Sequence, residues 1–182
     1  MILLSYREMD IIIHDLELES FSSIFRNIDE KKFKIISDNK KIKNCKGCFE
    51  CWIKTPGKCV IKDGYQDLGE SFSKADKIII ISKCYYGGYS PFVKKVLDRS
   101  IPYLLPFFRI EDNEIHHKIR YKKKFRLEVH FYGENIDEEE KDTANELVKA
   151  NSINLNLKEY SIFFDRSFMM LKNQVLNKGG QL

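Results

Sequence analysis

The chain has 182 residues, of which 43% are apolar and 32% charged, and its formal net charge is +4. This length suits one sizeable core and is too short for two ordinary domains, and the composition excludes a disordered chain. The longest basic run, at 121–124, is short and lies between apolar segments, so the charge pattern does not indicate a nucleic-acid partner. No apolar stretch approaches the length of a membrane span, so no membrane partner is expected either.

The first residues carry no sign of an export signal. Residues 1–8 hold four apolar residues and no small-residue cleavage site. We therefore expect a cytoplasmic protein, with 1–8 as an extension that has no role in the fold. Because cytosolic thiols stay reduced, a structural disulfide is the least expected use of the cysteines.

Strand and helix patterns alternate along the chain, in a single domain over residues 1–182. Apolar, β-branched runs predict strands, and amphipathic patterns with helix-start signals predict helices between them. In chain order they are a strand at 10–15, a helix at 19–28, strands at 32–37 and 77–82 with a helix at 65–75 between them, a helix at 90–105, a strand at 125–132, a helix at 137–153 and a strand at 160–164. The alternation predicts an α/β fold in three layers, a five-stranded parallel sheet of flavodoxin-like order 2-1-3-4-5 with helices on both faces. Residues 106–124 form an insertion that could cover a site or contact a second subunit.

In such a sheet the ligand lies beyond the carboxyl ends of the strands. The segment after the third strand, "SKCYYGGYS" (82–90), has Gly87 and Gly88, which let a backbone approach a ligand, and tyrosines beside them. Ser90 then starts a helix, whose N-terminus favours negative charge. A planar ring with polar edges, such as isoalloxazine, suits this segment; the alternative is a glycine turn whose tyrosines pack on their neighbours.

Four cysteines lie within fifteen positions, in the spacing C-x2-C-x2-C-x7-C. They are Cys45, Cys48, Cys51 and Cys59. Four thiolates suit a [4Fe–4S] cluster or a tetrahedral zinc, and the compact spacing favours the cluster. The alternative is that they are packed or redox-responsive thiols in a turn.

Two motifs resemble one known family. "SKCYYGGYSPFVKKVLDR" (82–99) resembles the ring-binding loop and helix S-P-V-Y-F-G-S-M-S-G-x-L-K-x-F-L-D-R of NAD(P)H-dependent FMN reductases. "CKGCFECWIKTPGKCVIKDGYQDL" (45–68) resembles the cysteine segment of a branch of that family that includes iron–sulfur flavoproteins. The resemblance is close over 44–105, about a third of the chain.

The resemblance implies a flavodoxin-like fold, FMN in the loops after the first, third and fourth strands, NAD(P)H and an electron acceptor as partners, and a homodimer. It places the four cysteines beside the flavin edge. It places six consecutive residues along the flavin ring, and the first of them stands where the family usually has proline. Two further residues, after the fourth strand, are assigned to the ring by their order in the chain and not by a motif. These are Lys83, Cys84, Tyr85, Tyr86, Gly87 and Gly88, followed by Tyr132 and Gly133.

The loop after the first strand departs from the family pattern G-S-P-R-x-x-G-N-T, which holds the FMN phosphate. This chain has "HDLELESFSS" (14–23), with carboxylates and neither glycine nor arginine. Ser20 and Ser22 could still donate hydrogen bonds at the start of the next helix, and His14 could help if protonated. Either FMN is held by a weakened phosphate anchor, or Lys83 and a partner subunit supply the missing charge, or the flavin has been lost.

The leading hypothesis is an FMN-dependent oxidoreductase that passes electrons from NAD(P)H to a small-molecule or protein acceptor, with no side chain needed as acid or base. One alternative is an iron–sulfur electron carrier with its cluster on the four cysteines. The other is a flavin-free module of the same fold that binds a partner through 106–124.

Overall fold

The computed structural model describes residues 9–26, 28–29, 31–111 and 113–170. Five parallel strands form the main sheet, in the order β2-β1-β3-β6-β7. They are β1 (Met9–His14), β2 (Phe33–Ser37), β3 (Ala75–Lys83), β6 (Arg126–Tyr132) and β7 (Glu159–Asp165). This is the predicted flavodoxin-like order, because β4 and β5 belong to a separate hairpin.

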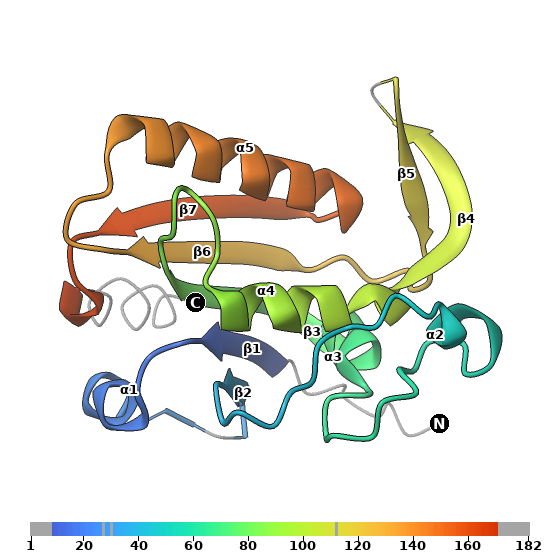
Figure 1. The fold of residues 1–182 in the computed structure, drawn as a ribbon, viewed down its shortest axis with the longest axis horizontal. Coiled ribbons are helices and arrows are strands. Elements are labelled where there is room, and N and C mark those ends of the chain that lie inside the picture. The colour runs from blue at the N-terminus through green and yellow to red at the C-terminus, as the bar shows by residue number, and fades with distance from the viewer. Residues whose placement is uncertain (1–8, 27, 30, 112, 171–182) are drawn as a thin grey trace, which may run out of the picture.

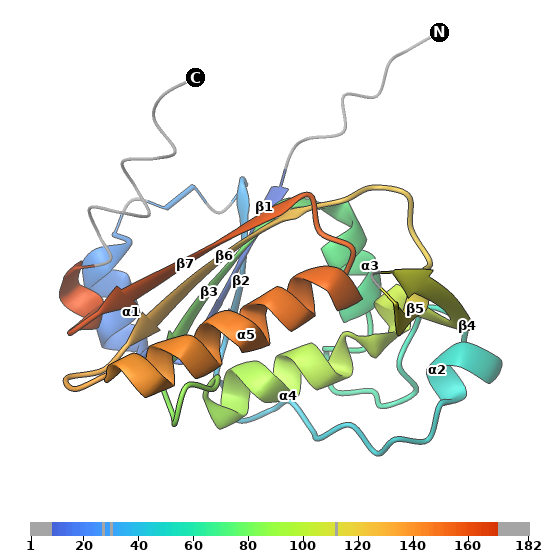
Figure 2. The same ribbon diagram turned by 90° about the horizontal axis from the view of Figure 1, so that it is seen from above.

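Helices cover both faces of the sheet, so the fold has three layers (Figure 1). One face carries α3 (Leu68–Lys74), α4 (Pro91–Arg99) and α5 (Glu138–Asn154), and the other carries α1 (Leu18–Ile24). Figure 2 shows α4 and α5 on the side of the sheet opposite α1. A four-residue helix, α2 (Glu50–Ile53), and short 3-10 turns at Ile101–Tyr103 and Phe168–Met170 complete the helical elements of the described residues.

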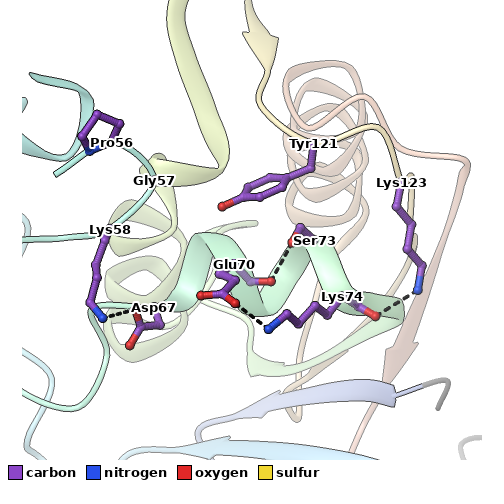
Figure 3. A pocket seen from close by; sticks show the side chains of 9 residues that line it. All are labelled: Pro56, Gly57, Lys58, Asp67, Glu70, Ser73, Lys74, Tyr121 and Lys123. Carbon is purple, nitrogen blue, oxygen red and sulfur yellow. Dashed lines mark hydrogen bonds and ion pairs between the residues drawn. The ribbon is translucent and has the colours of Figure 1, made fainter. Parts of the chain in front are cut away.

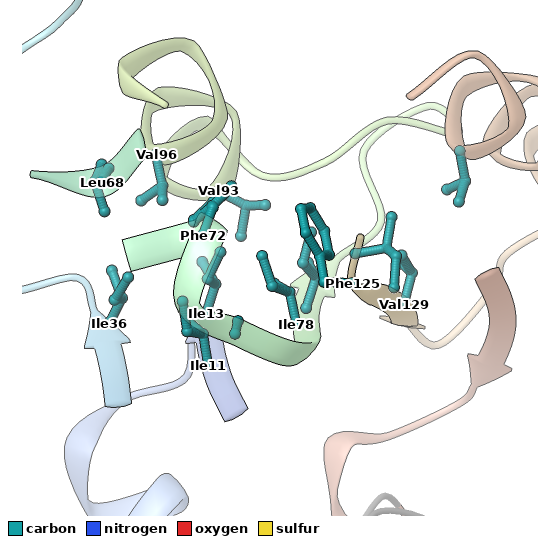
Figure 4. Close-up of a cluster of buried hydrophobic side chains, with 14 of the residues drawn as sticks. Ile11, Ile13, Ile36, Leu68, Phe72, Ile78, Val93, Val96, Phe125 and Val129 are labelled. Carbon is teal, nitrogen blue, oxygen red and sulfur yellow. The ribbon is translucent and has the colours of Figure 1, made fainter. Parts of the chain in front are cut away.

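Alternate isoleucines of β1 and β3 build the two halves of the core. Ile11 and Ile13 face α3 and α4, where Phe72, Val93 and others pack on them (Figure 4), while Ile12 faces α1. All three isoleucines are fully buried. Burying one such side chain contributes roughly 1.5–3 kcal/mol, so a strand that is apolar on both faces is most stable at the centre of the sheet.

The insertion and the end of the third predicted helix differ from the sequence prediction. The helix predicted over 90–105 ends at Arg99. Pro102 has no N–H to donate to a continuing α-helix, so α4 gives way to the 3-10 turn at Ile101–Tyr103. It continues as an antiparallel hairpin of β4 (Leu104–Glu111) and β5 (Glu114–Ile119).

Two other predictions extend beyond the residues that the structure describes. Residues 1–8, expected to be an extension, lie outside them, and the single-domain assignment over 1–182 stays a prediction. Within the described part of the chain, no helix has both the length and the apolar composition needed to cross a bilayer.

Candidate functional site

A pocket of about 380 Å³ lies at the carboxyl ends of the strands, as expected for this sheet order. It is formed by the segments that follow β1, β2, β3, β6 and β7. Its lining residues are Asp15, Leu16, Glu17, Ser20, Asp38, Lys83, Tyr85, Ser90, Pro91, Phe92, Tyr132 and Phe168.

Asp15, in the segment after β1, is hydrogen-bonded to the ends of β3 and β6. Its carboxylate accepts hydrogen bonds from the Lys83 amide (2.9 Å) and from the Tyr132 hydroxyl (3.0 Å). Burial raises the pKa of Asp15, although these hydrogen bonds and one with Ser90 oppose the rise. Burial and the adjacent Asp15 raise the pKa of Tyr132, so its hydroxyl stays a donor. The floor of the pocket is therefore held by a carboxylate that already has its partners.

The helix after the third strand starts at the pocket, as predicted. Ser90 caps α4 by accepting a hydrogen bond from the Val93 amide (3.4 Å), and Pro91 follows as the first helical residue. The Ser90 amide in turn donates to the Ser82 hydroxyl at the end of β3 (2.8 Å). These contacts fix the direction in which the chain leaves the sheet and bring Ser90 and Pro91 into the pocket wall.

The tyrosine–glycine loop is a tight turn that packs on α5. Tyr85 and Gly88 exchange backbone hydrogen bonds of 3.0 and 2.8 Å, and Tyr86 and Gly87 between them have φ of 53° and 75°. Such a turn needs positive φ at both central residues. A Cβ on Gly87 would lie 2.5 Å from Thr143 Cβ and 2.7 Å from the Glu140 carbonyl oxygen. Gly87 thus allows the close approach of this turn to a helix.

The structure brings some of the predicted site residues to the pocket and not others. Lys83, Tyr85, Tyr132 and Ser20 line it, and the Lys83 ammonium group lies 5.5 Å from the centre of the Tyr85 ring. The remaining predicted residues, Cys84, Tyr86, Gly87, Gly88, Gly133 and Ser22, are not among its lining residues. Their role in binding stays a prediction.

His14 cannot supply positive charge here, contrary to one expectation. Its ring is fully buried and stacks on Phe21 with 4.0 Å between ring centroids. Burial lowers its pKa to about 4, so the imidazole is neutral at physiological pH. His14 is a core residue on the α1 side of the sheet.

Sequence reasoning missed two contributors to the pocket. Asp38 directly follows the predicted strand at 32–37, so the rule that sites lie at carboxyl ends could have found it. Phe168 follows the last strand and packs edge-on against Tyr132, with ring centroids 5.9 Å apart. No motif marks Phe168, and only the sheet order brings it to Tyr132.

A larger hollow of about 710 Å³ lies between α3 and the segments 56–58 and 121–123 (Figure 3). Its charged side chains already have partners. Lys58 pairs with Asp67 (2.8 Å), Lys74 pairs with Glu70, and Lys123 pairs with Asp76 (2.7 Å). With its charges neutralised and no place at the carboxyl edge, this hollow is a poor candidate for the functional site.

The cysteine segment lies beside the C-terminal end of α4, whereas the pocket lies at the N-terminal end of that helix, and the expected position of the cysteines beside the flavin edge stays a prediction. Ser90 at the start of α4 lines the pocket, whereas Arg99 at its end lines the cysteine cavity. Nine helical residues separate them, which is about 13 Å. The Arg99 guanidinium holds the segment there by donating to Asp63 (2.7 Å) and to the Lys43 carbonyl oxygen (2.8 Å).

The four cysteines line one small cavity of about 60 Å³, but they do not form a ligand set. Among the described residues, no group of three or more His, Cys, Asp or Glu side chains is arranged to hold a metal ion. Cys45 and Cys48 are exposed, whereas Cys51 is buried. Burial, followed by the neighbouring thiolates, raises the pKa of Cys51 to about 11. In this structure Cys51 is a protonated, packed thiol.

The pocket suits a flavin ring better than it suits a terminal phosphate. Tyr85, Tyr132 and Phe168 provide aromatic walls. Around them, the described lining carries three carboxylates, Asp15, Glu17 and Asp38, and one ammonium group, that of Lys83. Three carboxylates against one cation disfavour a phosphate dianion.

This fold and pocket define the class: a flavodoxin-like α/β protein with a ligand pocket at the carboxyl edge of its parallel sheet. The model of the NADPH-dependent FMN reductase family matches residues 28–119, half of the chain. The chain therefore belongs to the NADPH-dependent FMN reductase family.

Curated relatives match parts of this chain. An iron–sulfur flavoprotein of Methanocaldococcus jannaschii is 35% identical over 89 residues, which are 49% of this chain and 45% of the relative. One from Archaeoglobus fulgidus is 34% identical over 70 residues, 38% of this chain and 31% of the relative. The chain thus matches less than half the length of these relatives.

Among solved structures, an NAD(P)H:quinone oxidoreductase from Methanothermobacter marburgensis matches with a TM-score of 0.53 and 13% identity, over 95% of this chain and 98% of the other. An FMN-dependent NADH-azoreductase from Bacillus anthracis, solved with FMN, matches with a TM-score of 0.51 and 11% identity, over 93% and 92%. At these identities the likeness shows the fold alone.

Proposed function

We propose that the chain is a flavin-dependent oxidoreductase that takes electrons from NAD(P)H and passes them to a small-molecule or protein acceptor. The observation that carries the proposal is the aromatic-walled pocket at the carboxyl edge of the sheet, in a chain of the FMN reductase family. A bound flavin supplies the redox chemistry, because it can accept a hydride and release electrons to a second partner.

The residues of this chain would bind and orient the flavin. Tyr85 and Tyr132 would contact the ring, since both line the pocket, Tyr85 from the loop after β3 and Tyr132 from the end of the neighbouring β6. Asp15 would keep the loop after β3 in place through its bonds to the Lys83 amide and the Tyr132 hydroxyl. No side chain need act as an acid or base in this proposal, so the protein's contribution is orientation and exclusion of water.

We do not include an iron–sulfur cluster in this function. Among the described residues no group of three or more His, Cys, Asp or Glu side chains is arranged to hold a metal ion, although all four cysteines line one cavity. The four cysteines are then thiols of the turn around α2, with Cys51 packed inside it and Cys45 and Cys48 exposed. Trp52 attaches this turn to the β4–β5 hairpin by donating to the Leu104 carbonyl oxygen (3.0 Å) and by packing on His117.

We further infer a homodimer that uses the β4–β5 hairpin as its contact. Phe107, Phe108, Ile110 and Ile115 expose 61–79% of their surface on this hairpin. Apolar side chains exposed together commonly mark a protein contact. A monomeric mass of 21.5 kDa in sedimentation equilibrium would contradict this inference.

Replacing Tyr85 by alanine tests the assignment of the pocket. Tyr85 is 45% exposed, so its loss should leave the fold intact while removing one aromatic wall. An aromatic contact is worth about 1 kcal/mol, so we expect flavin to bind about fivefold more weakly in a fluorescence titration. The matched control is Tyr160→Ala on β7, where the tyrosine is 42% exposed and does not line the pocket. Equal flavin affinity in the two variants would place the flavin elsewhere.

A further inference from the structure

The pocket differs from a phosphate-binding site in its charge, and this difference bears on which flavin it accepts. Asp15, Glu17 and Asp38 converge on it from the segments after β1 and β2. Lys83 is the one cation among the described lining residues, and its ammonium group already lies over the Tyr85 ring. A ligand with a dianionic group at this end would meet net repulsion.

The backbone amides of the loop after β3 do not compensate for that repulsion. The Lys83 amide donates to Asp15, and the amides of Tyr85 and Gly88 are used within their own turn. A phosphate site needs several amides that point at the ligand. Three amides of the loop after β3 are therefore unable to serve a phosphate.

Carboxylates at a pocket wall suit a different ligand group. A carboxylate accepts hydrogen bonds and cannot donate them, so it pairs well with hydroxyl groups. Riboflavin has the same ring system as FMN and carries a chain of hydroxyl groups that ends without phosphate. Its ring would use the aromatic walls, and its hydroxyl groups would donate to the carboxylates that repel a phosphate.

We propose that this pocket selects a phosphate-free flavin, with riboflavin bound more tightly than FMN. The inference rests on the proposed function, because it assumes that the pocket binds a flavin ring. The inference specifies the class of flavin that the pocket prefers, namely a flavin whose side chain ends without a charged group. Glu17 and Asp38 act as specificity-determining residues, since both line the pocket and both are exposed enough to meet the ligand.

The test compares the dissociation constants of riboflavin and FMN by fluorescence titration at low and high salt. We expect riboflavin to bind about tenfold more tightly than FMN at low salt, the ratio expected when one or two carboxylates oppose the phosphate at surface-like dielectric. High salt should narrow the difference by strengthening FMN binding alone, because screening weakens charge repulsion and leaves hydroxyl contacts unchanged.

Two isosteric variants assign the effect to the pocket. Glu17→Gln should bring FMN affinity about threefold closer to that of riboflavin, because it removes one lining carboxylate. Glu19→Gln is the matched control, since Glu19 is also exposed at the start of α1 but does not line the pocket. It should leave both affinities unchanged.

The outcomes separate this inference from the proposed function. If FMN binds as tightly as riboflavin or more tightly, the inference is wrong and the flavin-dependent function stands. If Glu19→Gln changes the ratio as much as Glu17→Gln, the selectivity does not come from this pocket and the inference is again wrong. If neither flavin binds the folded protein, the proposed function fails and the inference fails with it.

Discussion

Replacing Gly87 with alanine is expected to lower the free energy of unfolding by about 2–5 kcal/mol and to weaken flavin binding about fivefold, as loss of the Tyr85 ring does. The residue has φ of 75°, which an L side chain adopts at a cost, and its Cβ would lie 2.5 Å from Thr143 Cβ and 2.7 Å from the Glu140 carbonyl oxygen. Either the turn or α5 must move, and the turn carries Tyr85 into the pocket. Urea unfolding and flavin titration measure the two effects.

The neighbouring glycine provides the matched control. Gly88 does not have positive φ, and an added Cβ would lie 3.2 Å from the Tyr85 carbonyl oxygen, a contact that a small shift relieves. We expect Gly88→Ala to cost no more than about 1 kcal/mol and to retain flavin binding. Equal effects at the two positions would contradict the close packing of this turn on α5.

Asp63→Asn is expected to destabilise the protein by about 3–5 kcal/mol, because it leaves the buried Arg99 without its counter-charge. The side chains of Arg99 and Asp63 are 0% and 3% exposed, and two Arg99 nitrogens donate to the two Asp63 oxygens at 2.7 and 3.0 Å. Arg99 also donates to the carbonyl oxygens of Lys43 and Ile61, so it joins both ends of the cysteine segment to α4. Urea unfolding at neutral pH measures the loss.

The pH dependence of this pair follows from the pKa of Asp63. Burial alone would raise that pKa, but the hydrogen bonds from Arg99 and from the amides of Lys43 and Tyr65 lower it to about 2. In the unfolded chain the pKa of the Asp63 carboxyl group is about 4. The stabilisation is therefore complete above about pH 4 and is lost as the pH falls from there toward about 2. Asp63→Asn should remove this part of the acid sensitivity.

An exposed ion pair serves as the comparison for Asp63→Asn. Glu70 and Lys74 pair on the surface of α3, where each side chain is 51% exposed. Such pairs are worth less than about 1 kcal/mol, so Glu70→Gln should change stability only slightly. If Asp63→Asn had an equally small effect, Arg99 would not be the anchor of the cysteine segment.

Much of the fold could be predicted from local sequence patterns. The runs around Ile11–Ile13 and Ile78–Ile81 are apolar at every position and β-branched, which is typical of a strand covered on both faces. Ser90 and Pro91 marked the start of α4 correctly. The end of α4 was predicted too late, although Pro102 carried the signal. The hairpin at 104–119 was expected only as an insertion.

The site was harder to predict, because it depends on how distant segments meet. The acidic loop after β1 and the tyrosine loop after β3 were both identified as site segments. Nothing local indicated that Gly87 packs on α5, whereas the position of Asp38 directly after a strand was a usable signal. The cysteine spacing suggested a metal centre, but spacing alone does not say that Arg99 holds the segment at the far end of α4. These features depend on tertiary contacts between residues far apart in the sequence.

The most direct test of the central claim is the visible absorption spectrum of the anaerobic protein mixed with flavin, recorded before and after addition of NADPH. We predict a two-banded flavin spectrum that stays with the protein through gel filtration and bleaches when NADPH is added. No broad iron–sulfur shoulder should lie beneath it. A protein that stays colourless with both riboflavin and FMN would contradict the account, and so would a bound flavin that NADPH does not reduce.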